Sequence, residues 1–493
     1  MSLEVSTLYR SFSETATILG FLLAALAIGC APDLALGDLG AGGAGGGGGG
    51  SGGNGGSGAG GQGPEGGIPV WSRHFGGTAD QTGPNLAIDS GGDTVLLGEL
   101  SGSIELDRDT LVSVGAEDLL LARLDEMGDT RYSMRFGDAN PQFGHAVAID
   151  GNDEVLVAGE FSGNVDFGGP LQESAGGRDC YLAKLDAAGA PIWINVLGGI
   201  GYQAGVSVAT DSEGNVLIAG RFTGTVSWGQ ETLESAGSYD LFVAKLDPDG
   251  NFLWSRRFGD GYEQRSSGVA VDAMGNVFLL GEFAGTLDFG GELQLESAGD
   301  YDIFVAKLDA DGNPIWAKRF GDAGPQAARS LAVDGAGSVV IAGELTGTVD
   351  FGDGPRTASE GVAVFAAKLD AAGSPVWSKV FGESGSSSLK KIAVDGAGNV
   401  LLAGEFTGGI DFGSGVLESE DAEDVFVVKL DVDGRARWSQ RFGGPGSQRA
   451  SGVAVDVEGH ALVTGTFRGS VDLGGESLES DGNADIFLVK LTF

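Results

Sequence analysis

The sequence predicts an all-β protein in which one four-stranded antiparallel unit occurs seven times. Three observations lead to this prediction: a long repeat, apolar runs with the character of strands, and chain ends that complement each other. Each copy carries one aromatic residue near its end, and these residues are Trp71, Tyr132, Trp193, Trp254, Trp316, Trp377 and Trp438. Successive positions differ by 61 or 62 residues. A period of this length indicates an array of one structural unit.

The copy between residues 330 and 382 shows the elements of the unit. Its four short apolar runs are "SLAVD", "SVVIAGEL", "VFAAKLD" and "VWSKVFG". Turns join the first run to the second and the third to the fourth, and a long polar connection with a small β-like piece, "TVDF", joins the second to the third. Val, Ile, Phe and Trp dominate, and no run has the apolar period of a helix. The copy is therefore predicted to be a four-stranded meander.

The two ends of the repeat region predict a closed ring. The region begins with a fourth-strand sequence, "VWSRHFG" (residues 70–76), and it ends with a third-strand sequence, "DIFLVKLTF" (residues 485–493). Pairing of these two segments completes the last sheet and removes its open edge. Packing of sheets face to face around an axis buries both faces of each sheet. Residues 69–493 are thus predicted to form a seven-bladed β-propeller whose N-terminal strand closes the last blade.

The first 68 residues are predicted to be a targeting segment and a tether. Residues 16–29, "ATILGFLLAALAIG", form an apolar run that ends at Cys30 and has the length of a signal-peptide core. The small residues before Cys30 resemble a bacterial lipobox, which implies acylation of Cys30; an ordinary secretory signal with an incidental cysteine is the alternative. Residues 31–68 are almost all Gly with small polar residues, a composition typical of a disordered tether. These segments predict a lipid-anchored protein of a bacterial cell envelope, either periplasmic or at the cell surface.

The charge of the chain excludes some partners. With 29 Lys and Arg against 69 Asp and Glu, the formal net charge is −40, which repels nucleic acids and anionic membrane surfaces. We therefore expect contact with a membrane through the N-terminal lipid alone, no nucleic-acid partner, and a monomer. The two cysteines do not indicate a disulfide framework.

A recurring acidic element, as in Asp309-Ala-Asp-Gly, has two readings. It could be a calcium loop or a tight turn between the third and fourth strands. In other copies the second Asp is absent, as in Asp186-Ala-Ala-Gly, whereas the leading Asp and the Gly persist. A calcium loop needs several converging oxygens, whereas Asp and Gly are the residues of a turn. We expect a structural turn, with ion binding in some copies as the alternative.

Acidic residues also recur at both ends of the long connection. The second strand ends near a Glu and the third begins with an Asp, so these carboxylates are expected to meet at one rim. The four predicted pairs are Glu99 with Asp118, Glu160 with Asp179, Glu282 with Asp302, and Glu405 with Asp424. Such pairs could bind calcium or a cationic partner. Alternatively, each Asp caps loop amides, each Glu meets a basic group, and the recurrent Gln that opens the first strand clamps neighbouring blades.

The phrases "GNVLLAGEFTG" and "DIFVAKLDADGNPIW" resemble the bacterial SBBP-type β-propeller repeat, and the resemblance covers residues 70–493. It implies a lipoprotein-like, extracytoplasmic β-propeller. It transfers no catalytic residues and implies no cofactor.

Three classes of function remain open. The first is a non-catalytic binding or scaffold module for protein or polysaccharide, the second a propeller enzyme (a hydrolase or lyase) with a site in the central channel, and the third a structural envelope component. Near-identical blades argue against the second class, because catalysis needs different residues on different blades. Positions that depart from the repeat mark a possible asymmetric ligand site: Arg221, Ser227, Trp228 and Arg356.

Overall fold

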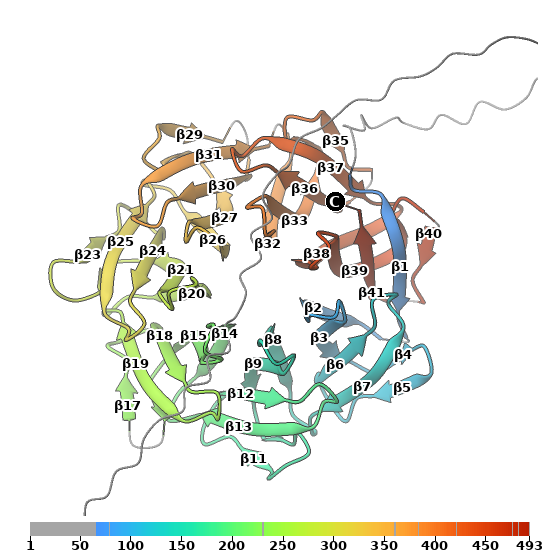
Figure 1. The fold of residues 1–493 in the computed structure, drawn as a ribbon, viewed down its shortest axis with the longest axis horizontal. Helices are drawn as coiled ribbons and strands as arrows, with labels where there is room; N and C mark the ends of the chain where they lie inside the picture. Colours follow the sequence, from blue (N-terminus) through green and yellow to red (C-terminus); the bar gives the residue numbers. More distant parts are fainter. Residues whose placement is uncertain are drawn as a thin grey trace, which may run out of the picture. The chain divides into compact units, whose positions relative to one another are not determined.

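The computed structural model describes residues 66–77, 79–228, 231–358, 361–382, 384–420, 422–475, 477–481 and 483–492. They form a ring of seven four-stranded antiparallel blades, which confirms the predicted seven-bladed β-propeller (Figure 1). Cys30 and nearly all of the predicted tether lie outside the described residues. The described residues contain no helix that is long and apolar enough to cross a membrane.

Each blade runs from a first strand at the central channel to a fourth strand at the circumference (Figure 1). The strands of the first four blades are β2 (Gln81–Ile88), β3 (Thr94–Leu100), β6 (Asp118–Leu124) and β7 (Thr130–Phe136); β8 (Gln142–Ile149), β9 (Val155–Phe161), β12 (Asp179–Leu185) and β13 (Pro191–Leu197); β14 (Gln203–Thr210), β15 (Val216–Phe222), β18 (Asp240–Leu246) and β19 (Phe252–Phe258); and β20 (Gln264–Val271), β21 (Val277–Phe283), β24 (Asp302–Leu308) and β25 (Pro314–Phe320). Those of the last three are β26 (Gln326–Val333), β27 (Val339–Leu345), β30 (Ala363–Leu369) and β31 (Pro375–Phe381); β32 (Ser386–Val394), β33 (Val400–Thr407), β36 (Asp424–Leu430) and β37 (Ala436–Phe442); and β38 (Gly446–Val455), β39 (Ala461–Asp472), β41 (Asp485–Leu491) and β1 (Pro69–Phe75).

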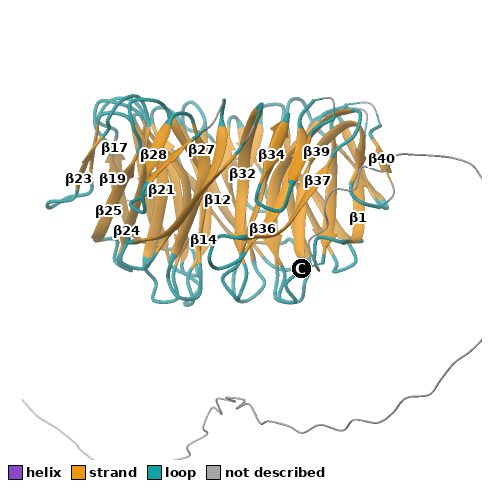
Figure 2. Ribbon diagram, turned by 90° about the horizontal axis from the view of Figure 1, so that it is seen from above, coloured by secondary structure: helices purple, strands orange, loops and turns teal. Residues whose placement is uncertain are grey.

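The long connection between the second and third strands folds into a small β-hairpin in each blade. The hairpin strands are β4 (Ser103–Leu106) and β5 (Asp109–Val112), β10 (Asn164–Val165) and β11 (Gln172–Glu173), β16 (Thr225–Trp228) and β17 (Glu231–Glu234), β22 (Thr286–Asp288) and β23 (Gln294–Glu296), β28 (Thr348–Asp350) and β29 (Pro355–Thr357), and β34 (Gly409–Asp411) and β35 (Val416–Glu418). In the seventh blade β40 (Ser477–Glu479) pairs with the end of β39. We call the face with these hairpins the hairpin face. The opposite face, with the tight turns after the first and third strands, is the turn face (Figure 2).

The ring closes between its first and last strands. β1 pairs antiparallel with β41, with Ser72 opposite Val489 and His74 opposite Phe487. The amide of Gly67 donates to the carbonyl of Thr492 beyond the strand pair. This is the predicted closure, and it leaves the seventh blade with the same four-stranded order as the others.

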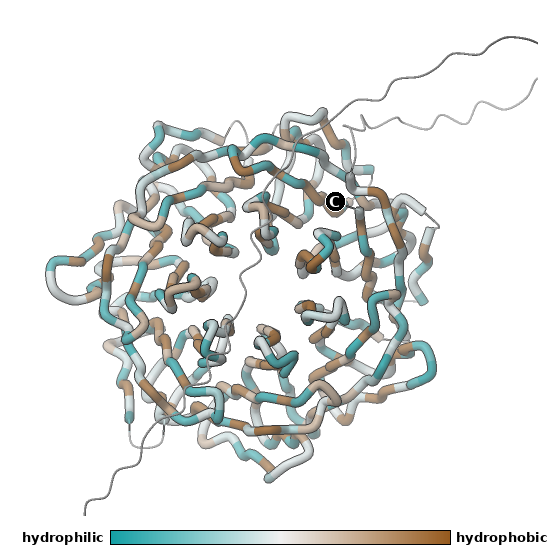
Figure 3. The backbone as a smooth tube through the Cα atoms, in the orientation of Figure 1, coloured by the Kyte–Doolittle hydropathy of each residue, from teal (hydrophilic) through white to brown (hydrophobic). Residues whose placement is uncertain are grey.

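The hydrophobic core lies between the blades rather than inside one layer. Seven clusters of buried side chains each join two neighbouring blades, and Figure 3 shows hydrophobic segments all around the ring. Every residue of the third strands, such as β12 and β24, is buried. Burial on both faces explains why these runs are continuously apolar instead of alternating with polar residues.

The Asp-x-Asp-Gly element is a turn that locks one blade to the next. Asp309 accepts hydrogen bonds from the amides of Asp311 and Asn313. Gly312 has a φ of +77°, and a Cβ there would lie 2.9 Å from the indole of Trp254 in the preceding blade. Trp254 in turn donates its Nε1 hydrogen to the carbonyl of Ala310, at 3.0 Å. The Gly is therefore required both by the backbone conformation and by the ring packed over it, as the turn hypothesis predicted.

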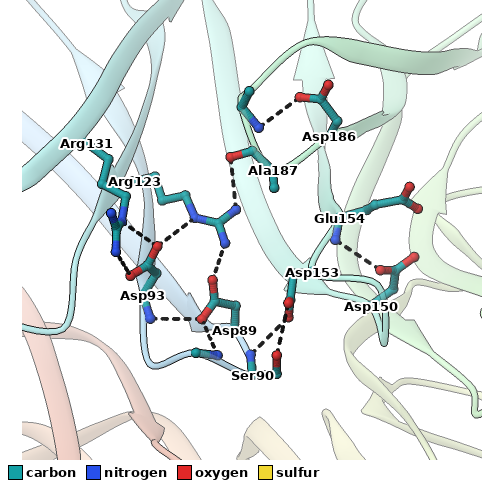
Figure 4. Close-up of polar contacts among 12 residues, drawn as sticks. Asp89, Ser90, Asp93, Arg123, Arg131, Asp150, Asp153, Glu154, Asp186 and Ala187 are labelled. Atoms are coloured by element: carbon teal, nitrogen blue, oxygen red, sulfur yellow. Dashed lines mark hydrogen bonds and ion pairs between the residues drawn. The ribbon is translucent and has the colours of Figure 1, made fainter.

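A buried ion pair joins the first and third strands of every blade near the turn face. The Asp that ends the first strand caps its own turn and also meets the basic residue of the third strand. The seven pairs are Asp89–Arg123, Asp150–Lys184, Asp211–Lys245, Asp272–Lys307, Asp334–Lys368, Asp395–Lys429 and Asp456–Lys490. In the first blade Arg123 also reaches Asp93 and the carbonyl of Ala187 in the next blade (Figure 4). The basic residues of the third strands thus neutralise acidic residues inside the protein.

Candidate functional site

The predicted pairs of Glu and Asp lie near the hairpin face, but the structure does not bring the two members of a pair together. Glu99 stands opposite Leu119, and Asp118 stands opposite Leu100. Side chains one residue apart in strand register point to opposite faces of a sheet. The same offset holds for Glu160 with Asp179, Glu282 with Asp302, and Glu405 with Asp424. The expected juxtaposition is therefore wrong, because it was inferred from strand ends without knowledge of the register.

The Asp members stabilise the long connections. The Asp118 side chain is fully buried and accepts a hydrogen bond from the amide of Val114 in the connection before it. It also pairs with Arg135 of the fourth strand, Nη1 to Oδ2, at 2.6 Å. Four blades share this Arg partner: Asp118–Arg135, Asp240–Arg257, Asp302–Arg319 and Asp424–Arg441. The loop-capping alternative describes these aspartates.

The second blade lacks the Arg partner. Val196 stands where the first, third, fourth and sixth blades carry the Arg, and the fully buried Asp179 has amide donors alone among the described residues. Burial raises the pKa of this carboxyl, and the amide hydrogen bonds of Ala175 and Gly199 offset part of the rise.

The Asp and Gln series come close to one another at the junctions after the first, third and fourth blades. A Cβ on Gly259 would lie 2.5 Å from Oε1 of Gln264 and 2.6 Å from Oδ1 of Asp240 in the preceding blade. The amide of Gln264 also donates to the carbonyl of Tyr239, next to that Asp. Between the fifth and sixth blades both members change together, to Ala363 and Ser387. The backbone amide at the Gln position therefore joins neighbouring blades, whereas the Gln264 side chain donates to Asp260 in the connection and to the carbonyl of Ala284 in its own blade.

The Glu members form a charged ring with basic groups around the channel entrance on the hairpin face. Glu344 accepts from Arg329 at 2.8 Å and, across the junction, from the hydroxyl of Ser388 at 2.6 Å. Glu405 pairs with Lys390 at 2.9 Å, although burial still raises the pKa of Glu405. Each carboxylate thus contacts a donor on its own blade or on the next.

Glu160 illustrates the balance of forces in this ring. Arg178 donates to it at 2.5 Å, the Tyr202 hydroxyl of the next blade also donates to it, and His145 lies 3.7 Å away. Burial would raise the pKa of Glu160, but these neighbours outweigh burial and lower it. In contrast, Glu99 has Thr82 as its hydrogen-bond donor, and burial raises the pKa of Glu99.

Two groups of side chains among the described residues have the spacing of metal ligands. They are His74 with Asp481 and Asp485, and Asp456 with Glu458 and His460. Asp485 already accepts from the amide of Asp481 and contacts His74, and Asp456 is paired with Lys490. Neither group contains a predicted rim pair, so calcium binding at those pairs gains no support from the geometry.

A cluster of arginine and aromatic side chains distinguishes the second, third and fourth blades on this face. The Cζ of Arg221 lies 5.4 Å from the ring centroid of Tyr239 and 5.9 Å from that of Tyr202. These two tyrosines pack edge to face at 5.5 Å. Arg178 over Phe143 and Arg265 over Tyr301 repeat the contact on either side, each at 4.6 Å. We call these seven residues the arginine–tyrosine cluster.

Arg221 is the one member of this cluster that the sequence analysis selected. The tyrosines were missed, although a signal existed: the residue before each third-strand Asp varies while the framework stays constant. In order, this position holds Glu117, Arg178, Tyr239, Tyr301, Val362, Glu423 and Ala484.

The four residues of the predicted asymmetric site do not form one site. Trp228 is buried in the core against Phe242 and Phe252, and Ser227 bonds to Thr232 within its hairpin. Arg356 belongs to β29 of the fifth blade, where it contacts Ser378 and Asp353. Trp228 fills the place of Phe or Leu in other hairpins, so its departure from the repeat is explained by packing.

No known family model matches the chain. An uncharacterised WD repeat-containing protein of Acanthamoeba polyphaga mimivirus is 28% identical over 198 residues, which are 34% of this chain and 14% of that protein. The regulatory protein FlaEY of Caulobacter vibrioides is 25% identical over 192 residues, or 37% of this chain and 20% of that protein. The chain therefore matches a small part of these curated relatives.

Several solved structures align with the chain at low sequence identity. A Dyadobacter fermentans protein of unknown function is 11% identical with a TM-score of 0.40, covering 86% of this chain and 99% of that one. The WD40 domain of Neurospora crassa Pan2 is 9% identical with a TM-score of 0.41, covering 85% and 97%. A puromycin hydrolase is 13% identical with a TM-score of 0.42, covering 80% and 53%. The structures that align with the chain thus include a WD40 domain and a hydrolase.

Proposed function

We propose that this protein is a non-catalytic binding module of a bacterial cell envelope, of the SBBP type that its repeats resemble. In this proposal a lipid on Cys30 holds it at a membrane, and the hairpin face binds another protein. A glycan partner, a purely structural role and a channel enzyme are the alternatives.

The arginine–tyrosine cluster is the observation that carries the binding role. Tyr and Arg dominate the energetics of protein interfaces because they bury a large area and also make directional hydrogen bonds. Phe143, Arg178, Tyr202, Arg221, Tyr239, Arg265 and Tyr301 are half-buried, so part of each remains accessible. The Nε of Arg221 is buried without an acceptor among the described residues. A carbonyl or carboxylate of a partner could supply that acceptor.

The path of the chain supports presentation of this face. β1 starts at the turn face, where Gly67 bonds to Thr492. The described residues before β1 therefore lie at the turn face, and the arginine–tyrosine cluster lies on the opposite face.

The central channel offers little for acid–base catalysis. The residues that line its cavity are aliphatic, small or amide-bearing, apart from Lys391. General acid–base chemistry usually needs two titratable groups placed at the reacting atoms. This lining supports the choice of a binding module over a hydrolase or lyase.

Substituting both Arg221→Ala and Tyr239→Ala should weaken capture of the protein partner from envelope extracts at least tenfold, because each hot-spot residue is worth about 2 kcal/mol. The measurement is a quantitative pull-down with mass spectrometry, followed by affinity measurement with the purified partner. Arg435→Ala, on the exposed turn face, is the matched control and should leave capture unchanged. Equal capture by the double variant would contradict the protein-binding role, and selective retention of polysaccharide would favour the glycan alternative.

Replacing Cys30→Ala should abolish incorporation of a labelled fatty acid and move the protein from the membrane to the soluble fraction. The expectation follows from the lipobox resemblance, since the thiol of Cys30 would be the acylated group. Cys180→Ala is the control, because that thiol is buried in the core and inaccessible to an acyltransferase. Absence of label in the unmodified protein, or label that persists in the Cys30→Ala variant, would exclude the lipid anchor.

A further inference from the structure

The seventh blade differs from the others at the point where β1 closes the ring. In the first, third, fourth and sixth blades, an Arg of the fourth strand pairs with the Asp that begins the third strand. The fourth strand of the seventh blade is β1, which carries His74 at the position of this Arg. The Nε2 of His74 lies 2.8 Å from Oδ2 of Asp485, the third-strand Asp of this blade. An imidazole thus stands in the place of a guanidinium.

A second carboxylate belongs to the same corner of the seventh blade. In six blades the residue four positions before the third-strand residue donates its amide to the Asp there, and these residues are Val114, Ala175, Ala236, Ala298, Glu420 and Asp481. Of these six, Glu420 and Asp481 alone carry a carboxylate. The sixth and seventh blades therefore have two acidic side chains where the first four have one.

The sixth blade shows what such a pair of carboxylates holds. Arg441 lies 2.9 Å from Oδ2 of Asp424 and 2.8 Å from Oε1 of Glu420, so one guanidinium joins both. An Arg side chain is always charged. In the part of the chain that the structure describes, neither Lys nor Arg pairs with Asp481 or Asp485. The pair of the seventh blade thus lacks the permanent cation that the sixth blade provides.

His74, Asp481 and Asp485 have the spacing of metal ligands. Their ligand atoms, one from each side chain, all lie within 4.8 Å of one another. Zinc binds imidazole nitrogen and carboxylate oxygen at about 2.0–2.2 Å, which places two ligands of a tetrahedral ion about 3.4 Å apart. The contact of 2.8 Å between His74 and Asp485 would therefore widen by about 0.6 Å on zinc binding. Asp481 is exposed and the His74 side chain is 22% exposed, so an ion and a water ligand can reach the site.

The other group with this spacing already holds a cation. The ammonium of Lys490 lies 2.8 Å from Oδ2 of Asp456, the same oxygen that contacts His460. A metal ion at Asp456, Glu458 and His460 would have to displace this buried ammonium. The group at the ring closure is therefore the stronger candidate.

We propose that His74, Asp481 and Asp485 bind one divalent transition-metal ion, for which zinc is the representative. One imidazole and two carboxylates suit zinc, and water completes the tetrahedron. The ion links β1 to β41 and to the connection before β41, so it stabilises the closure of the ring. The net charge of −40 attracts cations to the protein. The site needs no residue of the arginine–tyrosine cluster and is independent of the partner proposed there.

The test uses zinc chloride as the probe and the untagged full chain, freed of metals with EDTA. Every chain carries Cys30→Ala, so that the thiol of Cys30 adds no zinc ligand. Titration calorimetry should show one zinc site per chain, and the melting temperature should rise with the zinc concentration because the ion binds the folded state. Magnesium at the same concentration should produce a smaller rise, since imidazole favours zinc.

Two variants should lose the site without losing the fold. His74→Arg restores the residue of four other blades, and Asp481→Ala restores that of the second, third and fourth. Each should weaken zinc binding at least tenfold and remove the zinc-dependent rise in melting temperature. His460→Asn is the matched control, because the third, fourth and sixth blades carry Asn at that position, and it should bind zinc as the parent chain does.

Undiminished zinc binding by folded His74→Arg, or an equal response to magnesium, would overturn the proposal. Loss of binding in His460→Asn with retention in His74→Arg would overturn it too, because the ion would then belong to the other group. The chain has three histidines, so NMR of the imidazole nitrogens decides even if His74→Arg fails to fold. Zinc should shift the ring signals of His74, and unchanged His74 signals at saturating zinc would contradict the site.

Discussion

Replacing Lys184→Met is expected to destabilise the propeller by about 3–5 kcal/mol, the cost of leaving a buried charge without its partner. Lys184 is 2% exposed and lies 2.8 Å from Oδ2 of Asp150 and 2.7 Å from Oε2 of Glu154. Its ammonium also reaches the carbonyl of Pro248 in the next blade. Methionine fills a similar volume but offers no charge. The free energy of unfolding, measured by denaturant titration, reports the effect.

Two further variants separate the ion pair from its surroundings. Glu154→Gln should cost less than about 1 kcal/mol, because that carboxylate is partly exposed to solvent. The double variant Lys184→Met with Asp150→Asn should recover much of the loss, since no buried charge then remains. If the double variant were as unstable as Lys184→Met, loss of packing rather than of charge pairing would be the cause.

The pH dependence of these variants has a defined sign. Burial alone would raise the pKa of Asp150, but Lys184 and the turn amides of Asn152 and Glu154 outweigh burial and lower it. The resulting stabilisation is complete above the unfolded-state pKa of about 3.9 and is lost as the pH falls through the lower folded-state value. The unmodified protein should therefore lose stability in acid more steeply than the Lys184→Met variant.

Removing β1 is expected to have the largest effect on the whole ring. A chain that begins at Gly77 lacks the strand that covers the edge of β41, and it also loses the buried Phe75. An uncovered strand edge pairs readily with other chains. We expect a loss of more than about 5 kcal/mol in unfolding free energy, beyond the range of ordinary point substitutions, together with aggregation visible by light scattering.

A chain that begins at Gly66 provides the control for this deletion. It keeps β1 and the hydrogen bond from Gly67 to Thr492, so it should unfold at the same denaturant concentration as the full chain. If the chain beginning at Gly77 were monomeric and equally stable, closure of the ring by β1 would not stabilise the protein.

The fold was predictable because seven copies within one chain can be compared with one another. Constant features, such as the aromatic residue of the fourth strand and the turn Gly, identified strands and turns without other sequences. Both partners of the Asp150–Lys184 pair were visible as constant positions, but their contact was not, since it depends on how neighbouring strands twist. The same limit explains the error at Glu99 and Asp118, where a shift of one residue reverses the direction of a side chain.

The candidate sites were less predictable, because they depend on residues that vary between copies. Tyr202 and Tyr239 occupy different positions in the repeat, and their rings come together only in the folded third blade. Neither tyrosine therefore indicates a site when its own position is compared between copies. Lys391 was likewise visible as one basic residue among seven equivalents, but which residues share the channel lining with it depends on how the seven blades close into a ring. A single strand sequence does not contain that information.

Ala363 and Ser387 stand where the repeat has Asp and Gln, and this pair of differences shows which substitutions a propeller of this kind tolerates together. The two positions belong to neighbouring copies, which are joined there by the hydrogen bond from the amide of Ser387 to the carbonyl of Val362, and both depart from the repeat. The residues that must remain compatible are therefore those of one junction, to which each of the two neighbouring blades contributes half. Exchanging one whole blade for another would alter two junctions at once. Paired substitutions at one junction would leave the other junctions of the ring unchanged.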